Sequence, residues 1–103
     1  MSNPWRGEVE VEIDGEAVRA RLTLGALAAL EEALGAGSLV ALAERFEGGA
    51  VSARDVLAVL GAAARAGGWS GSDEDLARAE IGGGPLAGAR IAAQLLARAF
   101  GVA

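Results

Sequence analysis

The chain has 103 residues, enough for one domain with a modest core, and nine arginines against fourteen acidic residues leave it a net charge of −5. Such an acidic chain offers no cationic face for nucleic acid, and no apolar run reaches the roughly 20 residues that span a bilayer. Histidine, cysteine, lysine and tyrosine are absent, which excludes Cys-His and Ser-His nucleophiles, Schiff-base chemistry, disulfides and thiolate metal sites.

Residues 1–6 do not combine a basic segment with a following apolar stretch, so we expect no secretory signal and a cytoplasmic protein. We expect one domain over residues 1–103, because the glycine pairs fall between periodic segments and are typical of tight connections between helices. The predicted fold is α+β, with an N-terminal hairpin and a bundle of about five short helices over about residues 23–101.

A β-hairpin is predicted over about residues 8–22. Residues 8–13 alternate charged and apolar side chains, the pattern of a strand with one buried face. Asp14-Gly15 follows, and this dipeptide favours a two-residue type I′ turn. That turn sets one register, in which apolar residues face apolar ones and opposite charges face each other. The expected pairs are Val11 with Val18, Val9 with Ala20, Glu10 with Arg19 and Glu8 with Arg21.

Helical spacing of apolar residues begins after the hairpin. Thr23 is placed to cap a first helix that ends near Gly35, and Ser38 to cap a short second helix. The predicted apolar face of the first helix consists of Leu24, Leu27, Leu30 and Leu34. That of the second helix consists of Leu39, Leu42, Ala43 and Phe46. The second helix stops at residues 48–49.

Two Ser-x-x-Asp sequences resemble capping boxes, at residues 52–55 and 72–75, with aspartate in place of the usual glutamate. They predict a third helix to about Ala66 and a short fourth helix that residues 82–84 break. Pro85 suits the first position of a fifth helix, which reaches almost to the C-terminus. Residues 81–88 lack the Gly-Lys-Ser/Thr ending of a phosphate-binding loop, so we interpret them as adjoining helix caps.

Carboxylates are the main candidates for chemistry. Asp73, Glu74 and Asp75 form one group, and Glu31 and Glu32 form a second. Paired acids can cleave glycosides, but the first group follows Ser72 as the first turn of a helix would, and the second lies on the polar side of a helix. The acidic segment also lacks the alternating ligands and central glycine of a calcium loop. We therefore predict no catalytic residue, no metal ligand and no cofactor.

The four aromatic residues are the candidates for protein contact. Phe46 and Phe100 lie at the apolar ends of helices, where a core position is expected. Trp5 and Trp69 lie outside the periodic segments, so each either covers the core or stands at a contact with another protein, where tryptophan is over-represented. The hairpin edges are a further contact candidate, and Ala- and Leu-rich helices allow a homodimer.

Several segments together resemble the small tail protein of bacterial gene transfer agents, a family grouped with phage tail assembly chaperones and also labelled tail tube proteins. The resemblance covers nearly the whole chain. The segments that carry it are residues 3–9 (NPWRGEV), 22–27 (LTLGAL), 39–46 (LVALAERF), 52–57 (SARDVL), 65–69 (RAGGW) and 92–100 (AAQLLARAF).

The resemblance implies a role in building a phage-like tail. Tail assembly chaperones hold the long tape-measure protein until tube subunits polymerise around it, and the family brings no catalytic residues. A tube subunit normally needs a β-rich sandwich, whereas this chain offers one hairpin, so we favour the chaperone. The alternative is a minor tail or adaptor component that stays in the particle, and a hydrolase that uses Asp73 or Glu74 ranks far below both.

Overall fold

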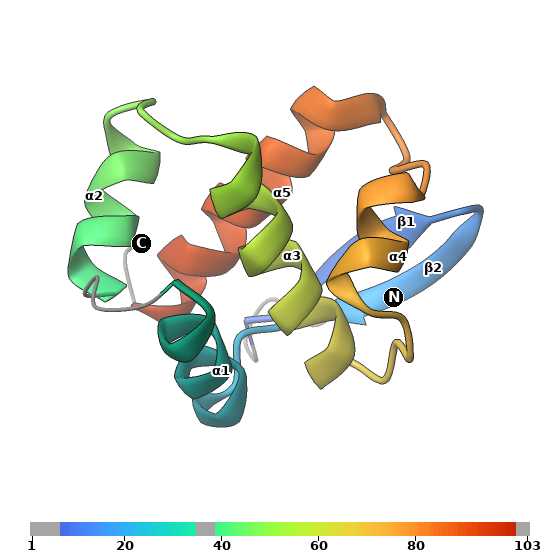
Figure 1. Ribbon diagram of the computed structural model, residues 1–103, viewed down its shortest axis with the longest axis horizontal. Coiled ribbons are helices and arrows are strands. Elements are labelled where there is room, and N and C mark those ends of the chain that lie inside the picture. The colour runs from blue at the N-terminus through green and yellow to red at the C-terminus, as the bar shows by residue number, and fades with distance from the viewer. Residues whose placement is uncertain (1–6, 35–38, 101–103) are drawn as a thin grey trace.

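Five helices and a two-stranded antiparallel sheet form the described part of the chain (Figure 1). The structure is a computed structural model that describes residues 7–34 and 39–100. It confirms the predicted α+β fold, with the hairpin first and the helices after it. The elements are β1 (Val9–Ile13), β2 (Glu16–Ala20), α1 (Leu24–Leu34), α2 (Leu39–Glu47), α3 (Ala53–Ala66), α4 (Asp73–Arg78) and α5 (Gly84–Ala99).

The hairpin has the predicted turn and register. Asp14 and Gly15 both have positive φ, 50° and 81°, as a type I′ turn requires. The pairs Val9 with Ala20, Glu10 with Arg19 and Val11 with Val18 lie opposite each other. Alternation then places the apolar side chains on the face that packs against the helices and the charged ones in solvent.

The predicted serine caps are present at two helices. Ser52 accepts a hydrogen bond from the Asp55 amide and Ser72 accepts one from the Asp75 amide, and both aspartates reach back to the serine amide. Thr23 Oγ1 likewise accepts from the Ala26 amide at 3.0 Å. Gly35 and Ser38, the other predicted helix boundaries, lie outside the described residues.

Helix α3 lies at the centre of the fold. Residues 61–64 are all buried, and four consecutive helical positions face in every direction, so neighbours surround this helix. Its buried residues are mostly alanine and glycine, which lets α1, α5 and β2 approach closely. At its C-terminal end the Arg21 amide donates to the Ala63 carbonyl at 3.2 Å, which ties the end of the hairpin to α3.

The predicted face of α1 was partly wrong. Leu30 is buried as expected, but Leu24 is 85% exposed, and Ala26 is buried in its place. Ala26 lies about 200° round the helix from Leu24, so the core-facing side includes a small residue that a search for leucines overlooks. The side chain of Leu34 lies outside the described residues.

The predicted boundaries near the glycine run were also wrong. Helix α4 ends at Arg78, because residues 80–82 pair with the edge of β1 instead of continuing the helix. The Gly82 amide donates to the Glu12 carbonyl at 2.9 Å, and the Asp14 amide donates to the Glu80 carbonyl at 2.8 Å. Helix α5 then starts at Gly84, so Pro85 is its second residue rather than its first.

Among the described residues, no helix combines the length and the apolar character that crossing a bilayer would need.

Candidate functional site

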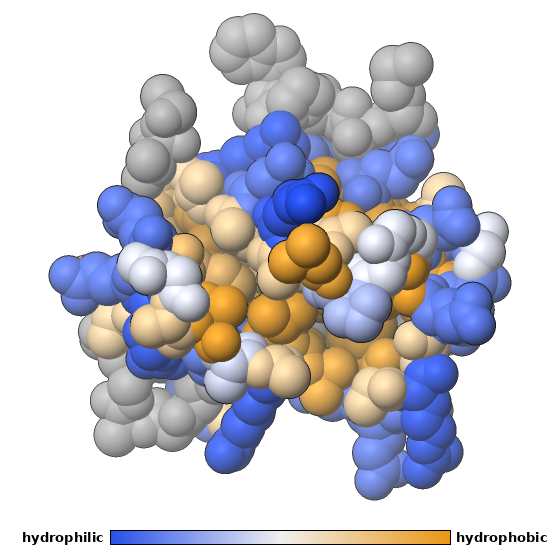
Figure 2. Space-filling view, turned by 90° about the horizontal axis from the view of Figure 1, so that it is seen from above, coloured by the Kyte–Doolittle hydropathy of each residue, from blue (hydrophilic) through white to orange (hydrophobic). Residues whose placement is uncertain are grey.

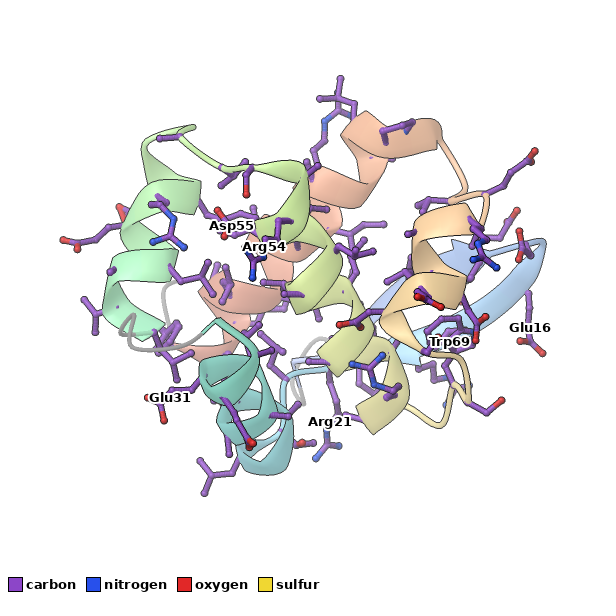
Figure 3. The ribbon with its side chains drawn as sticks, in the orientation of Figure 1. Glu16, Arg21, Glu31, Arg54, Asp55 and Trp69 are labelled. Carbon is purple, nitrogen blue, oxygen red and sulfur yellow. The ribbon has the colours of Figure 1, made fainter. Side chains whose placement is uncertain are left out.

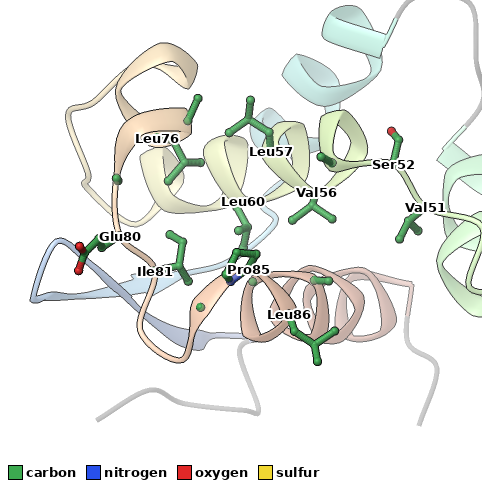
Figure 4. A pocket seen from close by; sticks show the side chains of 16 residues that line it. Val51, Ser52, Val56, Leu57, Leu60, Leu76, Glu80, Ile81, Pro85 and Leu86 are labelled. Atoms are coloured by element: carbon green, nitrogen blue, oxygen red, sulfur yellow. The ribbon is translucent and has the colours of Figure 1, made fainter.

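An apolar groove runs between α3, α4 and α5, and we call it the α3–α5 groove. Its volume is about 900 Å³. Figure 2 shows hydrophobic side chains gathered across the middle of the face at the top of Figure 1, with hydrophilic ones around them. The side chains that line the groove are mostly aliphatic and come from all three helices and their connections; Val56, Leu57, Leu60, Leu76, Ile81 and Leu86 are the largest (Figure 4).

The floor of the groove is set by the close approach of α3 and α5. Gly88 of α5 is buried, and a Cβ at this position would lie 3.4 Å from Leu60 Cδ1 and 4.0 Å from Val56 Cγ1. The absence of a side chain at Gly88 therefore lets the two helices meet there. Leu86, two residues earlier on α5, is 67% exposed and stands at the rim.

The α4 wall is positioned by an ion pair with α3. Arg65 Nη1 lies 2.8 Å from Asp73 Oδ1, at the first residue of α4. Gly61 lies beneath this pair, and a Cβ there would overlap the Asp73 carboxylate. Leu76 follows on the inner face of α4 and is buried against the core.

The far end of the groove is fixed at the N-terminus of α3. Asp55 is buried and closes the cap with Ser52, and Arg45 of α2 donates to both of its oxygens, at 3.1 and 3.3 Å. The hydrogen bond from Arg45 holds the pKa of the Asp55 carboxyl below its usual value, and the Ser52 amide adds to this against the opposing effect of burial. The charged carboxylate therefore joins α2 to the N-terminus of α3, at the end of the groove.

Replacing Asp55 with asparagine should remove a pH-dependent part of the stability. Because the folded pKa is lowered, the carboxylate stabilises the fold above its unfolded value of 3.8, and this stabilisation is lost as the pH falls through the folded value. We expect Asp55→Asn to lower the free energy of unfolding by about 1–3 kcal/mol at pH 7. Urea titrations from pH 7 to pH 3 should show the difference shrink, and a constant difference would contradict the assignment.

The carboxylates considered for catalysis either make contacts that stabilise a helix or are exposed to solvent. Asp73 pairs with Arg65, Asp75 caps α4, and Glu31 and Glu32 are exposed on α1. Hydrogen bonds from Ser72, chiefly from its amide, lower the pKa of Asp75, as expected of a helix cap. Within residues 7–34 and 39–100 no group of three or more acidic residues is placed to hold a metal ion.

The described aromatic residues lie outside the α3–α5 groove. Trp69 is partly buried against the core, beside the hairpin at the opposite end of α3 from Asp55, and is not among the residues that line the groove (Figure 3). Phe46 and Phe100 meet at a smaller cavity of about 250 Å³ between α2 and α5. Phe100 is 39% exposed, which corrects the expected core position, because it lies at the end of α5. Trp5 lies outside the described residues.

Sequence reasoning did not identify the residues of the groove, because they come from segments that appear separately as ordinary helix faces. The one available signal was the cluster of aliphatic residues around the glycine run, at Leu76, Ile81 and Leu86. Of the groove-lining residues only Glu80 is charged, and Ser52 Oγ accepts from a backbone amide in its cap. The groove can therefore bind a partner by burying apolar surface rather than by reacting with it.

A family model described as "Phage tail tube protein, GTA-gp10" matches residues 6–102. Searches of curated proteins and of solved structures returned no match.

Proposed function

Because the chain belongs to the phage tail protein family GTA-gp10, we propose that it acts during tail assembly as a chaperone that binds a helical segment of the tape-measure protein. The observation that carries this proposal is the α3–α5 groove, an open apolar surface framed by three helices. Grooves of this kind accept the apolar stripe of an amphipathic helix, whose side chains at positions i, i+3, i+4 and i+7 enter together.

The size and lining of the groove agree with such an occupant. A volume of about 900 Å³ accommodates several large aliphatic side chains. Leu57 and Ile81 are only partly buried, and Leu86 is mostly exposed, so binding a helix here would remove apolar area from water. A long helical chain with such stripes aggregates when free, and covering them would keep it soluble.

Replacing Leu86 with glutamate should abolish binding without unfolding the protein. Leu86 is exposed, so the substitution costs little stability, but it places a charge where an apolar side chain must be buried. The test is co-expression with the tape-measure protein of the same cluster, followed by sizing chromatography. We expect a complex with the parent chain and at least a tenfold loss of complex with Leu86→Glu.

Leu24→Glu is the matched control, since it makes the same change at an exposed leucine on α1, away from the groove. It should bind as the parent does. If both variants bound equally, the groove would not be the binding surface. A tape-measure protein that stayed insoluble with the parent chain would contradict the chaperone proposal itself.

A second candidate is a component that remains in the particle as a tube, minor tail or adaptor subunit. The description of the family as a tail tube protein favours it. Mass spectrometry of purified particles separates the two functions, because a structural subunit is present in stoichiometric amounts whereas a chaperone is depleted. The single two-stranded sheet of the described residues supports the chaperone, since tube subunits normally associate through larger sheets.

A further inference from the structure

Helix α2 contributes fewer buried residues to the core than the neighbouring helix α3 does. Among the described residues it contributes one fully buried side chain, Leu42, whereas α3 contributes eight buried residues. Val40 on the same helix is 63% exposed. In Figure 1, α2 stands at one side of the molecule against the C-terminal half of α5. Moving α2 away from α5 would therefore expose Leu42 with the partly buried Leu39 and Phe46, fewer residues than α3 buries.

The contact between α2 and α5 is also incompletely filled. A cavity of about 250 Å³ lies between the two helices, lined by Phe46 and Ala43 on one side and by Leu96, Ala97 and Phe100 on the other. Side chains that face a void lose the dispersion contacts that a packed neighbour would give. This part of the interface accordingly contributes less to stability than a fully packed contact would.

An ion pair between Arg45 and Asp55 joins α2 to the N-terminus of α3. Its two hydrogen bonds reach across the loop from α2 to the N-terminus of α3. The Asp55 side chain is 11% exposed and that of Arg45 is 41% exposed, so the pair is shielded on the Asp55 side, whereas the Arg65–Asp73 pair joins side chains that are 38% and 46% exposed. A shielded, two-contact pair holds better than an exposed one.

We propose that α2 is a reversible cover on the C-terminal half of α5, latched by Arg45 and Asp55, which opens as a unit while the hairpin and α3 stay folded. Regions with few buried apolar contacts open at lower free energy than the core. Opening exposes Ala93, Leu96 and Phe100, an apolar strip on the same helix that forms one wall of the α3–α5 groove. This proposal goes beyond the chaperone function and does not depend on it.

Hydrogen exchange of the purified protein, read by NMR or by mass spectrometry of α2 and α3 peptides, tests the cover directly. In the parent chain the amides of residues 43–48 should exchange at least tenfold faster than those of residues 59–64. Arg45→Gln, which removes the latch, should speed exchange in α2 by a further tenfold. Arg65→Gln breaks the other ion pair and should leave α2 exchange unchanged.

Ala97→Leu tests the proposal in the opposite direction, because it should strengthen the contact between α2 and α5. It fills part of the cavity and should slow exchange in α2 about threefold or more, and it remains informative if Arg45→Gln fails to fold. Equal protection of α2 and α3 in the parent chain would overturn the proposal, because α2 would then open only when the whole fold unfolds. An Arg45→Gln variant whose α2 amides exchanged no faster than those of the parent chain would overturn the latch as well.

Discussion

Replacing Gly67 with alanine should destabilise the protein more than the same change at any other described glycine with ordinary backbone angles. Gly67 follows the last turn of α3 with φ −89° and ψ 6°, which any residue adopts. A Cβ there would overlap the Arg19 carbonyl oxygen of β2. Both sides of this contact are backbone, so no rotamer change relieves it, and α3 or the hairpin must shift.

We expect Gly67→Ala to lower the free energy of unfolding by about 2–3 kcal/mol, measured by urea denaturation followed by circular dichroism. Gly25→Ala is the control, because a Cβ at Gly25 meets only Thr23 Oγ1 at 3.9 Å. Gly25 lies in exposed helix, where alanine is favoured by up to about 1 kcal/mol, so this variant should be no less stable than the parent. A Gly67→Ala variant of parental stability would show that α3 and β2 do not approach as described.

Replacing Leu95 with alanine should cost about 2–5 kcal/mol, because the change removes buried methyl groups and leaves a cavity behind. Leu95 is 0% exposed and lies in the core on α5. Leu86 offers the same substitution on the same helix, but it is 67% exposed. Leu86→Ala should change the free energy of unfolding by less than about 0.5 kcal/mol.

Thermal melts of the two leucine variants give the comparison directly, since both lose the same atoms from the same helix. Leu95→Ala should melt well below the parent, and Leu86→Ala close to it. Equal losses would mean that α5 presents a different face to the core. That outcome would also remove Leu86 from the rim of the α3–α5 groove.

Local features of the fold were predictable because neighbouring residues determine them. The Asp14-Gly15 turn fixed one register for the hairpin, and side-chain caps at Ser52 and Ser72 marked the starts of α3 and α4. In each case the partners lie within a few residues of one another. The helical bundle could be predicted for the same reason, from apolar spacing and glycine breaks.

Features that depend on distant partners were not predictable. Residues 80–82 join the edge of β1 through hydrogen bonds to Glu12 and Asp14, nearly 70 residues away in the sequence, so the glycine run did not reveal the strand-like pairing. The α3–α5 groove likewise arises where three helices meet, and exposure of Leu86 follows from that packing alone. Trp69, Phe46 and Phe100 are not among the residues that line the groove, and their role as protein contacts stays a prediction.

The hairpin is bounded on both sides by other parts of the chain. Residues 80–82 occupy one end of the β1 edge, and the end of α3 closes on β2 at Arg19 and Arg21. A two-stranded sheet usually invites fibre growth at its free strands, and here residues 80–82 occupy part of the β1 edge to which another strand would add. Aggregates in concentrated stocks should therefore dissolve in mild detergents, which cover the apolar surfaces of helices. The same aggregates should bind little of a dye that reports amyloid.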